Sequence, residues 1–216
     1  MTSPSISDRQ RAIWDSRQVS SVIQIRDAEP ADAPLIAWDL ETATDRMFSI
    51  MLGGRWEASL TRAVSEPGTS WSIARARVAE VGGSPVGVIL SGPADEPAPS
   101  DSLGLPWGLT RLRSSIVGFT FLPFLSFMKH HQRGEWYITA VSVMPEARGH
   151  GVGAALLRDA AEQARAAGMA SVTLDVDEKN HTARRLYERE GFALVASSPR
   201  AWLAGGIQVL RMRKGI

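Results

Sequence analysis

A strand-to-helix junction, VSVMPEARGHGVGAALL from Val141 to Leu157, constrains the fold of this chain more than any other segment. Its start has the composition of a strand, and its end has the alanine and leucine content of a helix. Three alternating glycines, Gly149, Gly151 and Gly153, lie between them, directly after Arg148. Glycine allows positive φ angles and close approach to a ligand, and the first turn of a helix leaves N–H groups unpaired. The junction therefore predicts an anion-binding turn suited to a pyrophosphate.

The elements around this turn predict a strand–helix–strand unit. EWYITAVSV, starting at Glu135, is β-branched and aromatic, and GVGAALLRDAAEQARAAG carries an apolar stripe that ends at Gly168. ASVTLDV then alternates as a second strand, which predicts a right-handed crossover between parallel strands. Upstream, the pattern predicts a strand over 22–26, a helix after Pro30 and a hairpin over 71–92. Downstream it predicts a short helix and two strands, so the class is α/β (α+β).

Composition excludes several other classes of protein. With 24 Lys and Arg against 23 Asp and Glu, the chain lacks the basic excess of a nucleic-acid binder. It has no cysteine, so it has no disulfide, thiolate metal site or cysteine nucleophile, which fits a cytoplasmic location. The apolar run from Ile116 to Met128 is interrupted by Pro123 and is shorter than the ~20 residues that a membrane-spanning helix needs. We therefore predict no membrane partner and no metal.

The chain is expected to form one domain with two additions. Residues 1–20 lack the features of a signal peptide and are expected to form a flexible tail. Residues 21–216 would form the domain, with a helical insertion at about 93–133 that starts in a segment rich in Pro, Asp and Ser.

The glycine turn has two interpretations besides a pyrophosphate site, and the whole protein has one alternative class, a hydrolase. A tight turn that binds nothing remains open, and Gly149-x-Gly151-x-x-Ala154 formally matches a dinucleotide-binding fingerprint. Against the dinucleotide fold, PEAR separates the strand from the first glycine, and Asp175 lies inside a strand rather than at its end. A hydrolase has little support, because the chain contains no GxSxG elbow.

Two motifs together resemble the GNAT superfamily of acyl-CoA-dependent N-acyltransferases. Its pyrophosphate motif has Arg or Gln, two residues, Gly, one residue, then Gly or Ala, and here Arg148, Gly151 and Gly153 fill it. The later NHTARRLYEREGF resembles the second motif of the family, with Asn180 seven residues before Tyr187 and a Gly-Phe pair after it. The resemblance covers about 135–195 firmly. It implies a mixed, mostly antiparallel sheet flanked by helices, with a V-shaped splay between the central parallel strands.

The resemblance assigns donor-binding roles to single residues. The backbone of Val141 and Val143 would pair with the pantetheine of acetyl-CoA as an added strand would, and Asn180 would hydrogen-bond it. Tyr187 would protonate the departing thiolate, a role that the ordinary tyrosine pKa of about 10 permits. Taken alone, Asn180 could equally be a helix cap and Tyr187 a core aromatic. The pyrophosphate would lie on the backbone of the turn, formed by Arg148, Gly149, His150, Gly151, Val152 and Gly153.

The base and the acceptor site are the least defined parts of the prediction. Glu135 starts the strand where some family members carry a catalytic glutamate, although a solvated strand-end glutamate is the other reading; His130 and His131 are alternatives. Trp107, Phe119, Phe121, Phe124 and Phe127 are predicted to build an acceptor pocket or a dimer interface.

The resemblance implies transfer of an acetyl group to a primary amine by direct attack, since no cysteine is present to form an acyl-enzyme. Homodimers are common in the family. The alternative function is a non-catalytic acyl-CoA-binding regulatory module of the same fold.

Overall fold

The structure is a computed structural model. It describes residues 23–43, 48–49, 53–66, 71–94, 127, 131–200 and 206–216. The predicted tail at 1–20 and most of the predicted insertion, including Trp107, Phe119, Phe121, Phe124 and His130, lie outside these residues.

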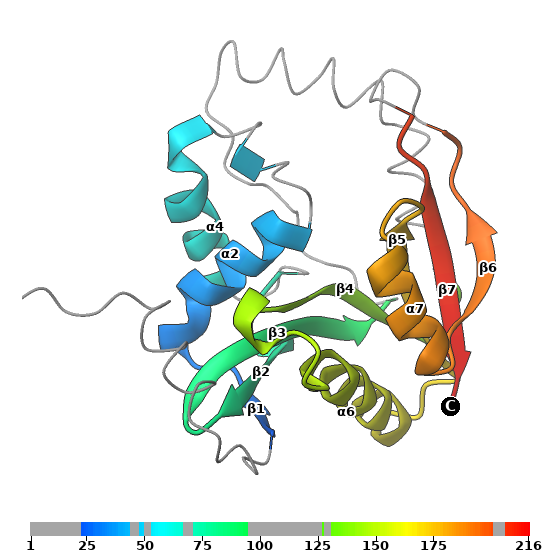
Figure 1. Ribbon diagram of the computed structural model, residues 1–216, viewed down its shortest axis with the longest axis horizontal. Helices are drawn as coiled ribbons and strands as arrows, with labels where there is room; N and C mark the ends of the chain where they lie inside the picture. Colours follow the sequence, from blue (N-terminus) through cyan, green and yellow to red (C-terminus); the bar gives the residue numbers. More distant parts are fainter. Residues whose placement is uncertain are drawn as a thin grey trace, which may run out of the picture.

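A seven-stranded sheet in the order β1-β2-β3-β4-β5-β7-β6 forms the centre of the molecule (Figure 1). All neighbouring strands are antiparallel except β4 and β5, which are parallel. The predicted mixed, mostly antiparallel sheet is therefore confirmed. The strands are β1 (Gln24–Asp27), β2 (Ala76–Val81), β3 (Ser84–Pro93), β4 (Glu135–Val143), β5 (Ser171–Asp177), β6 (Ala193–Ser197) and β7 (Val209–Gly215).

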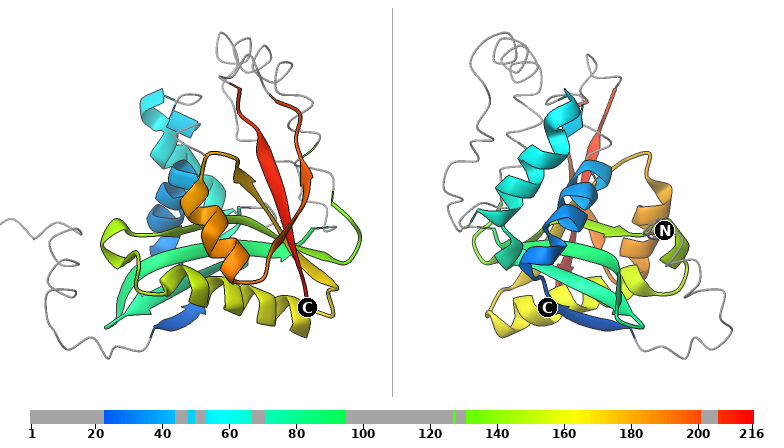
Figure 2. Two further views of the ribbon diagram at one scale, coloured as in Figure 1. Left: turned by 45° about the vertical axis from the view of Figure 1, so that its right-hand side comes forward. Right: turned by 90° about the vertical axis from the view of Figure 1, so that its left-hand side faces the viewer.

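Helices cover both faces of the sheet. On one face lie α2 (Ala33–Ala43) and α4 (Trp56–Ser65), and on the other lie α6 (Val152–Ala166) and α7 (His181–Arg189). Figure 2 shows α2 and α4 across strands β2 to β4 from α6. Each face has its own buried apolar cluster, so the sheet separates two cores. The predicted apolar stripe of α6 is buried in the second core: Leu156, Leu157, Ala160, Ala161 and Ala164.

The pairing between β4 and β5 stops in the middle of both strands. Their register runs from Glu135↔Ser171 to Ile138↔Leu174, although β4 continues to Val143 and β5 to Asp177. On its other side, β4 pairs with β3 throughout, with a register shift between Leu90 and Ser91. Such a shift bends a strand and increases its twist. The two central strands are thus unpaired beyond Ile138 and Leu174, which is where the predicted splay would begin.

The predicted hairpin over 71–92 is confirmed, but its first strand begins later than the alternation suggested. Ile73–Arg75 forms a 3-10 turn instead of strand, and β2 starts at Ala76. The hydroxyl of Ser72 accepts a hydrogen bond from the N–H of Ala74 at 3.4 Å and caps this turn. Side-chain capping of this kind gives the backbone an alternative to the sheet ladder. In the part of the chain that the structure describes, no helix has the length and hydropathy to cross a membrane.

Gly87 is required by the close packing of β3 against β4 and α6. A Cβ atom at this position would lie 2.9 Å from the carbonyl oxygen of Ser142 and 3.2 Å from Cγ1 of Val152. We expect Gly87→Ala to lower the free energy of unfolding by about 1–3 kcal/mol, because a backbone atom cannot move aside as a side chain does. Urea unfolding measures this. Gly54→Ala is the control, since nothing lies within 4 Å of its Cβ, and an equal loss there would contradict the packing argument.

Candidate active site

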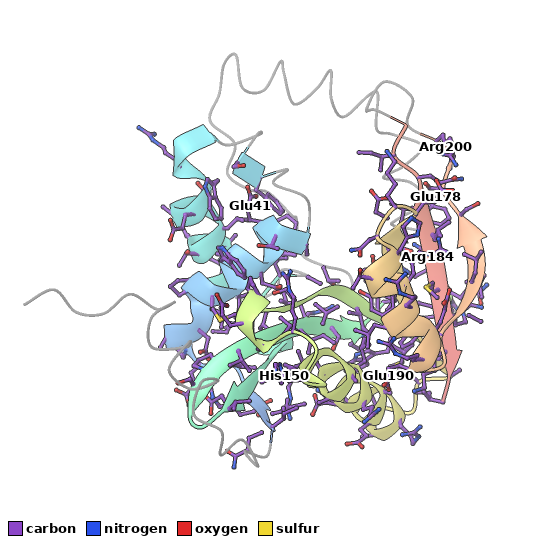
Figure 3. All side chains as sticks on the ribbon, in the orientation of Figure 1. Glu41, His150, Glu178, Arg184, Glu190 and Arg200 are labelled. Atoms are coloured by element: carbon purple, nitrogen blue, oxygen red, sulfur yellow. The ribbon has the colours of Figure 1, made fainter. Side chains whose placement is uncertain are left out.

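The glycine turn is exposed at the start of α6. Gly149 and Gly151 have φ angles of 80° and 85°, and Gly151 is the N-cap residue in the left-handed conformation. Gly149, His150 and Gly151 are exposed, and Figure 3 labels His150 near the start of α6. The N–H groups of Val152, Gly153 and Ala154 have no carbonyl partner within the helix, because the first bond of the helix is from Ala155 to Gly151 at 3.0 Å. The turn therefore has the open N–H groups that an anion site requires, and the pyrophosphate contact stays a prediction.

Two contacts hold this turn against the neighbouring elements. The guanidinium Nε of Arg148 donates to the carbonyl of Val143 at 3.0 Å, which ties the turn to the end of β4. A Cβ atom on Gly153 would lie 3.0 Å from Cδ2 of Leu186. Gly153 thus lets α6 approach α7 closely, which is a packing reason for the last glycine of the motif.

The backbone of β4 beyond Ile138 presents polar groups away from β3. The N–H of Met144 donates to the carbonyl of Val86 at 2.9 Å, in the same register that pairs Ser142 with Val88. Because alternate residues of an antiparallel strand bond to the same neighbour, Val141 and Val143 direct their N–H groups the other way. That side of β4 no longer pairs with β5. The strand-like contact of Val141 and Val143 with pantetheine stays a prediction, and it requires an unpaired strand side of this kind.

Tyr187 lies on α7 and is buried, with 7% of its surface exposed. Its ring is tilted against that of Phe192, with the centroids 6.1 Å apart. Burial raises the pKa of Tyr187 to about 12, and the charge of Asp39 on α2 adds to this effect. The hydroxyl therefore stays protonated at neutral pH, as a proton donor must. The structure thus shows Tyr187 as a buried aromatic residue of the core. Its role as the acid that protonates the thiolate stays a prediction.

Asn180 caps α7. Its side-chain oxygen accepts a hydrogen bond from the N–H of Ala183 at 3.1 Å. The cap accounts for Asn180 structurally and leaves its amide NH₂ to donate to a ligand. The turn before it is held by Glu178, whose carboxylate binds Arg200 at 2.8 Å and whose carbonyl accepts from Arg184 at 3.3 Å. Figure 3 shows these three side chains together beside the start of α7.

Glu135 is not a solvated residue, which corrects one of the two sequence-based readings. Its side chain is only 3% exposed, and its carboxylate forms an ion pair with Arg213 of β7. It also accepts the N–H of Gln132 at 2.9 Å and lies 3.9 Å from Nδ1 of His131. Glu135 belongs to the closed, paired end of the β4–β5 pair. Its predicted role as base is untested, and its lone pairs already have strong partners.

A second buried ion pair lies on the neighbouring strands. Asp175 of β5 and Arg211 of β7 are 2.8 Å apart with side chains 4% and 7% exposed, and the hydroxyl of Tyr137 donates to Asp175 at 3.2 Å. Arg211 also lies 4.6 Å from the ring centroid of Phe127 and donates to its carbonyl at 2.9 Å. Phe127, predicted for the acceptor pocket, therefore packs on this network. Trp136 of β4 is buried in the apolar cluster on the α6 side of the sheet.

Asp39 is the buried residue that the sequence did not single out. It lies on α2 and is fully buried. Burial raises the pKa of its carboxyl from the ordinary 3.8 to about 8, and the hydroxyl of Ser142 on β4 counteracts this in part. Neither carboxyl oxygen has a hydrogen bond of ordinary geometry to any described residue. An aspartate inside WDLET of an amphipathic helix carries no signal in the sequence alone, since only packing decides that it is buried.

The fold is that of acetyltransferases of known structure. A crystal structure of an acetyltransferase is 25% identical, with a TM-score of 0.64, and covers 89% of this chain and 99% of that chain. An N-acetyltransferase from Staphylococcus aureus Mu50 is 18% identical over 88% and 99% of the two chains, with a TM-score of 0.67. The ribosomal-protein-S18-alanine N-acetyltransferase from Escherichia coli is 16% identical over 90% and 94%, with a TM-score of 0.51.

The sequence identifies the family. Residues 54–192 match the Acetyltransferase (GNAT) family. The chain therefore belongs to the GNAT family of acetyltransferases, which confirms the resemblance and makes it an N-acetyltransferase in general terms. Members of the family generally use acetyl-CoA as their co-substrate. No curated protein sequence matches this chain. Among the described residues, no three His, Cys, Asp or Glu side chains form a group that could hold a metal ion.

Proposed function

We propose that the protein transfers an acetyl group from acetyl-CoA to a primary amine by direct attack within a ternary complex. The observation that carries this proposal is a continuous path across three elements. The exposed N–H groups before α6 lead to the unpaired side of β4. Tyr187 of α7 is buried against the same apolar cluster as α6 and Val141 of β4. A dinucleotide fold is not supported, because the sheet has one parallel pair.

The donor would lie along this path. Its pyrophosphate would accept hydrogen bonds from the N–H groups of the turn. Its pantetheine would pair with the backbone of Val141 and Val143 and accept a hydrogen bond from the side-chain amide of Asn180. In the reaction, the amine nitrogen bonds to the thioester carbon, and the C–S bond then breaks. Tyr187 gives its hydroxyl proton to the leaving thiolate. The donor residues of the turn are Arg148, Gly149, His150, Gly151, Val152 and Gly153.

The donor site is tested by acetyl-CoA binding to a charged variant of the turn. We expect Gly151→Glu to abolish binding in isothermal titration, because a carboxylate would occupy the pyrophosphate position and repel it. Gly168→Glu is the matched control: it lies just past the other end of α6, has a φ angle of 71° and, like Gly151, has nothing within 4 Å of its Cβ. Equal backbone strain is thus introduced at both sites. A folded parent that binds no acetyl-CoA, or equal loss in both variants, would contradict the proposal.

The location, domain limits and oligomeric state remain proposals. Absence of cysteine supports a cytoplasmic location, and residues 21–216 as one domain with an insertion at about 93–133 fit the continuous sheet. A homodimer through β6 is supported by the position of this strand at the sheet edge, with Leu194 57% and Val195 45% exposed. Light scattering of the parent and of Leu194→Lys measures this, and a monomeric parent would rule it out.

A further inference from the structure

The fully buried carboxyl of Asp39 is unusual in having so little polar support. A charge without hydrogen bonds in an apolar interior is costly, so such groups are retained at positions where function requires them or are held neutral. Among the described residues, Ser142 of β4 and Tyr187 of α7 are the polar groups that interact with Asp39. Among the residues that the structure describes, no lysine or arginine shifts its pKa. A cation that arrived beside Asp39 would therefore find an uncompensated carboxylate.

Asp39 lies on the face of the sheet that α2 covers, and its neighbours indicate a position beside the unpaired ends of β4 and β5, which we call the opening. Its helix, α2, packs on the core with Ala140 and Val88, while Tyr187 packs on the core of the opposite face. A continuous sheet keeps the side chains of its two faces apart, so Asp39 and Tyr187 interact across the part where β4 and β5 are unpaired. Ser142, the other neighbour, lies between Val141 and Val143 on β4. Asp39 therefore lies beside the residues of β4 that are predicted to pair with the pantetheine.

We propose that the carboxylate of Asp39 binds the ammonium group of the acceptor at this opening and takes from it the proton that must leave before attack. The inference rests on the proposed function and adds that the acceptor is an amine that is positively charged in solution. Ser142 orients the carboxylate, and Tyr187 on the other face donates to the leaving group.

The proton balance of this step is complete. One N–H bond of the ammonium breaks and its proton joins Asp39, leaving a neutral amine whose lone pair attacks the thioester carbon. The collapse of the tetrahedral intermediate breaks the C–S bond, and the thiolate takes the hydroxyl proton of Tyr187. The amide nitrogen loses a second proton to Tyr187, which restores it, and Asp39 releases its proton to solvent. The sum converts the ammonium and acetyl-CoA to the acetamide, CoA and one proton.

Glu135 is the competing base and differs from Asp39 in its partners. Its carboxylate already forms an ion pair with Arg213 and accepts the N–H of Gln132. These partners occupy the carboxylate oxygens that a proton from the acceptor would have to reach. Glu135 also lies at the paired end of β4, four residues before the first unpaired position, Thr139. Asp39 has neither restriction, so the structure favours it.

The test compares Asp39→Asn, Glu135→Gln and Glu41→Gln with the parent. Glu41 is the other buried carboxylate of α2, and it accepts hydrogen bonds from the N–H of Ser49 at 3.1 Å. The probes are acetyl-CoA with an alkyl diamine, an aminoglycoside and a peptide with a free α-amine. Methoxyamine, which is neutral at neutral pH, serves as an acceptor that needs no base. Titration with acetyl-CoA shows whether each variant keeps its fold and donor site.

We expect Asp39→Asn to lower kcat on the cationic amines by about 10²–10⁴-fold, the usual contribution of a general base. Its loss on methoxyamine should stay below about tenfold, since that nitrogen has no proton to remove before attack. The parent kcat/KM should rise as Asp39 ionises and fall as the amine loses its proton near pH 10. In Asp39→Asn, kcat/KM should increase with pH only as the fraction of neutral amine in solution increases. Glu41→Gln should retain the activity of the parent.

The outcomes separate this inference from the proposed function. If Glu135→Gln, and not Asp39→Asn, removes the pH dependence, or if Asp39→Asn loses equal activity on both kinds of acceptor, Asp39 is not the proton acceptor and acetyl transfer still stands. If the parent binds acetyl-CoA but acetylates none of the amines, the inference fails and the non-catalytic module is supported. If the parent binds no acetyl-CoA, both proposals fail.

Discussion

Replacing Tyr187 with phenylalanine should lower kcat by about 10²–10⁴-fold while leaving the affinity for acetyl-CoA almost unchanged. The ring keeps its packing against Phe192, because only the hydroxyl is removed. Without it, the leaving thiolate has to depart unprotonated or take a proton from water. The loss therefore belongs to the chemical step and not to donor binding. Steady-state kinetics with the best amine acceptor, together with isothermal titration with acetyl-CoA, measure the two quantities separately.

Tyr137 offers a matched control, since it is the only other tyrosine of the chain. Its hydroxyl donates to Asp175 at 3.2 Å, so Tyr137→Phe removes the same group as Tyr187→Phe together with one hydrogen bond. We expect that variant to lose about 1 kcal/mol of stability and to keep kcat within a few-fold of the parent. The pKa of Tyr187, about 12, further implies that its hydroxyl causes no decline in rate below about pH 11. Equal kinetic losses in the two variants would show that Tyr187 acts through packing.

Asp39→Asn should make the protein more stable relative to the parent as the pH rises from 5 to 8. The folded protein holds the Asp39 proton up to a pKa of about 8, whereas the unfolded chain releases it near 3.8. Between these values the folded state binds more protons, so the stability of the parent falls by about 1.4 kcal/mol for each pH unit. Below the lower value both states are protonated and this cost is absent. Asparagine has no proton to release, so its contribution is constant.

Urea unfolding of the two proteins at pH 5 and pH 8 measures this difference. From pH 5 to pH 8, the advantage of Asp39→Asn over the parent should grow by about 4 kcal/mol. Other titrating groups contribute equally to both proteins and cancel in the comparison. This result needs no substrate and does not depend on the proposed role in catalysis. A difference that is the same at both pH values would mean that the carboxyl of Asp39 ionises normally, and the proposed proton transfer would lose its physical basis.

The sequence by itself determined the parts of this protein whose physics is local. The glycine turn could be recognised before the structure, because positive φ angles at Gly149 and Gly151 and the open N–H groups of a helix start depend on neighbours in the chain. The helix α6, the crossover and the hairpin followed from the periodicity of apolar residues in the same way. Boundaries were less certain, as at Ile73, where Ser72 caps a turn and delays the strand.

Only the tertiary structure decided the environment of the acidic residues. Asp39 has nothing in its local sequence to distinguish it, and its raised pKa comes from burial under residues distant along the chain. Glu135 was predicted to be either the base or a solvated glutamate at a strand end, yet Arg213, 78 residues later in the sequence, is its partner. Electrostatic energies depend on what surrounds a charge in three dimensions, and a one-dimensional pattern does not contain that information. The candidate donor turn could thus be predicted from residue order, while the burial of Asp39 emerged only from the packing of α2 against β3 and β4.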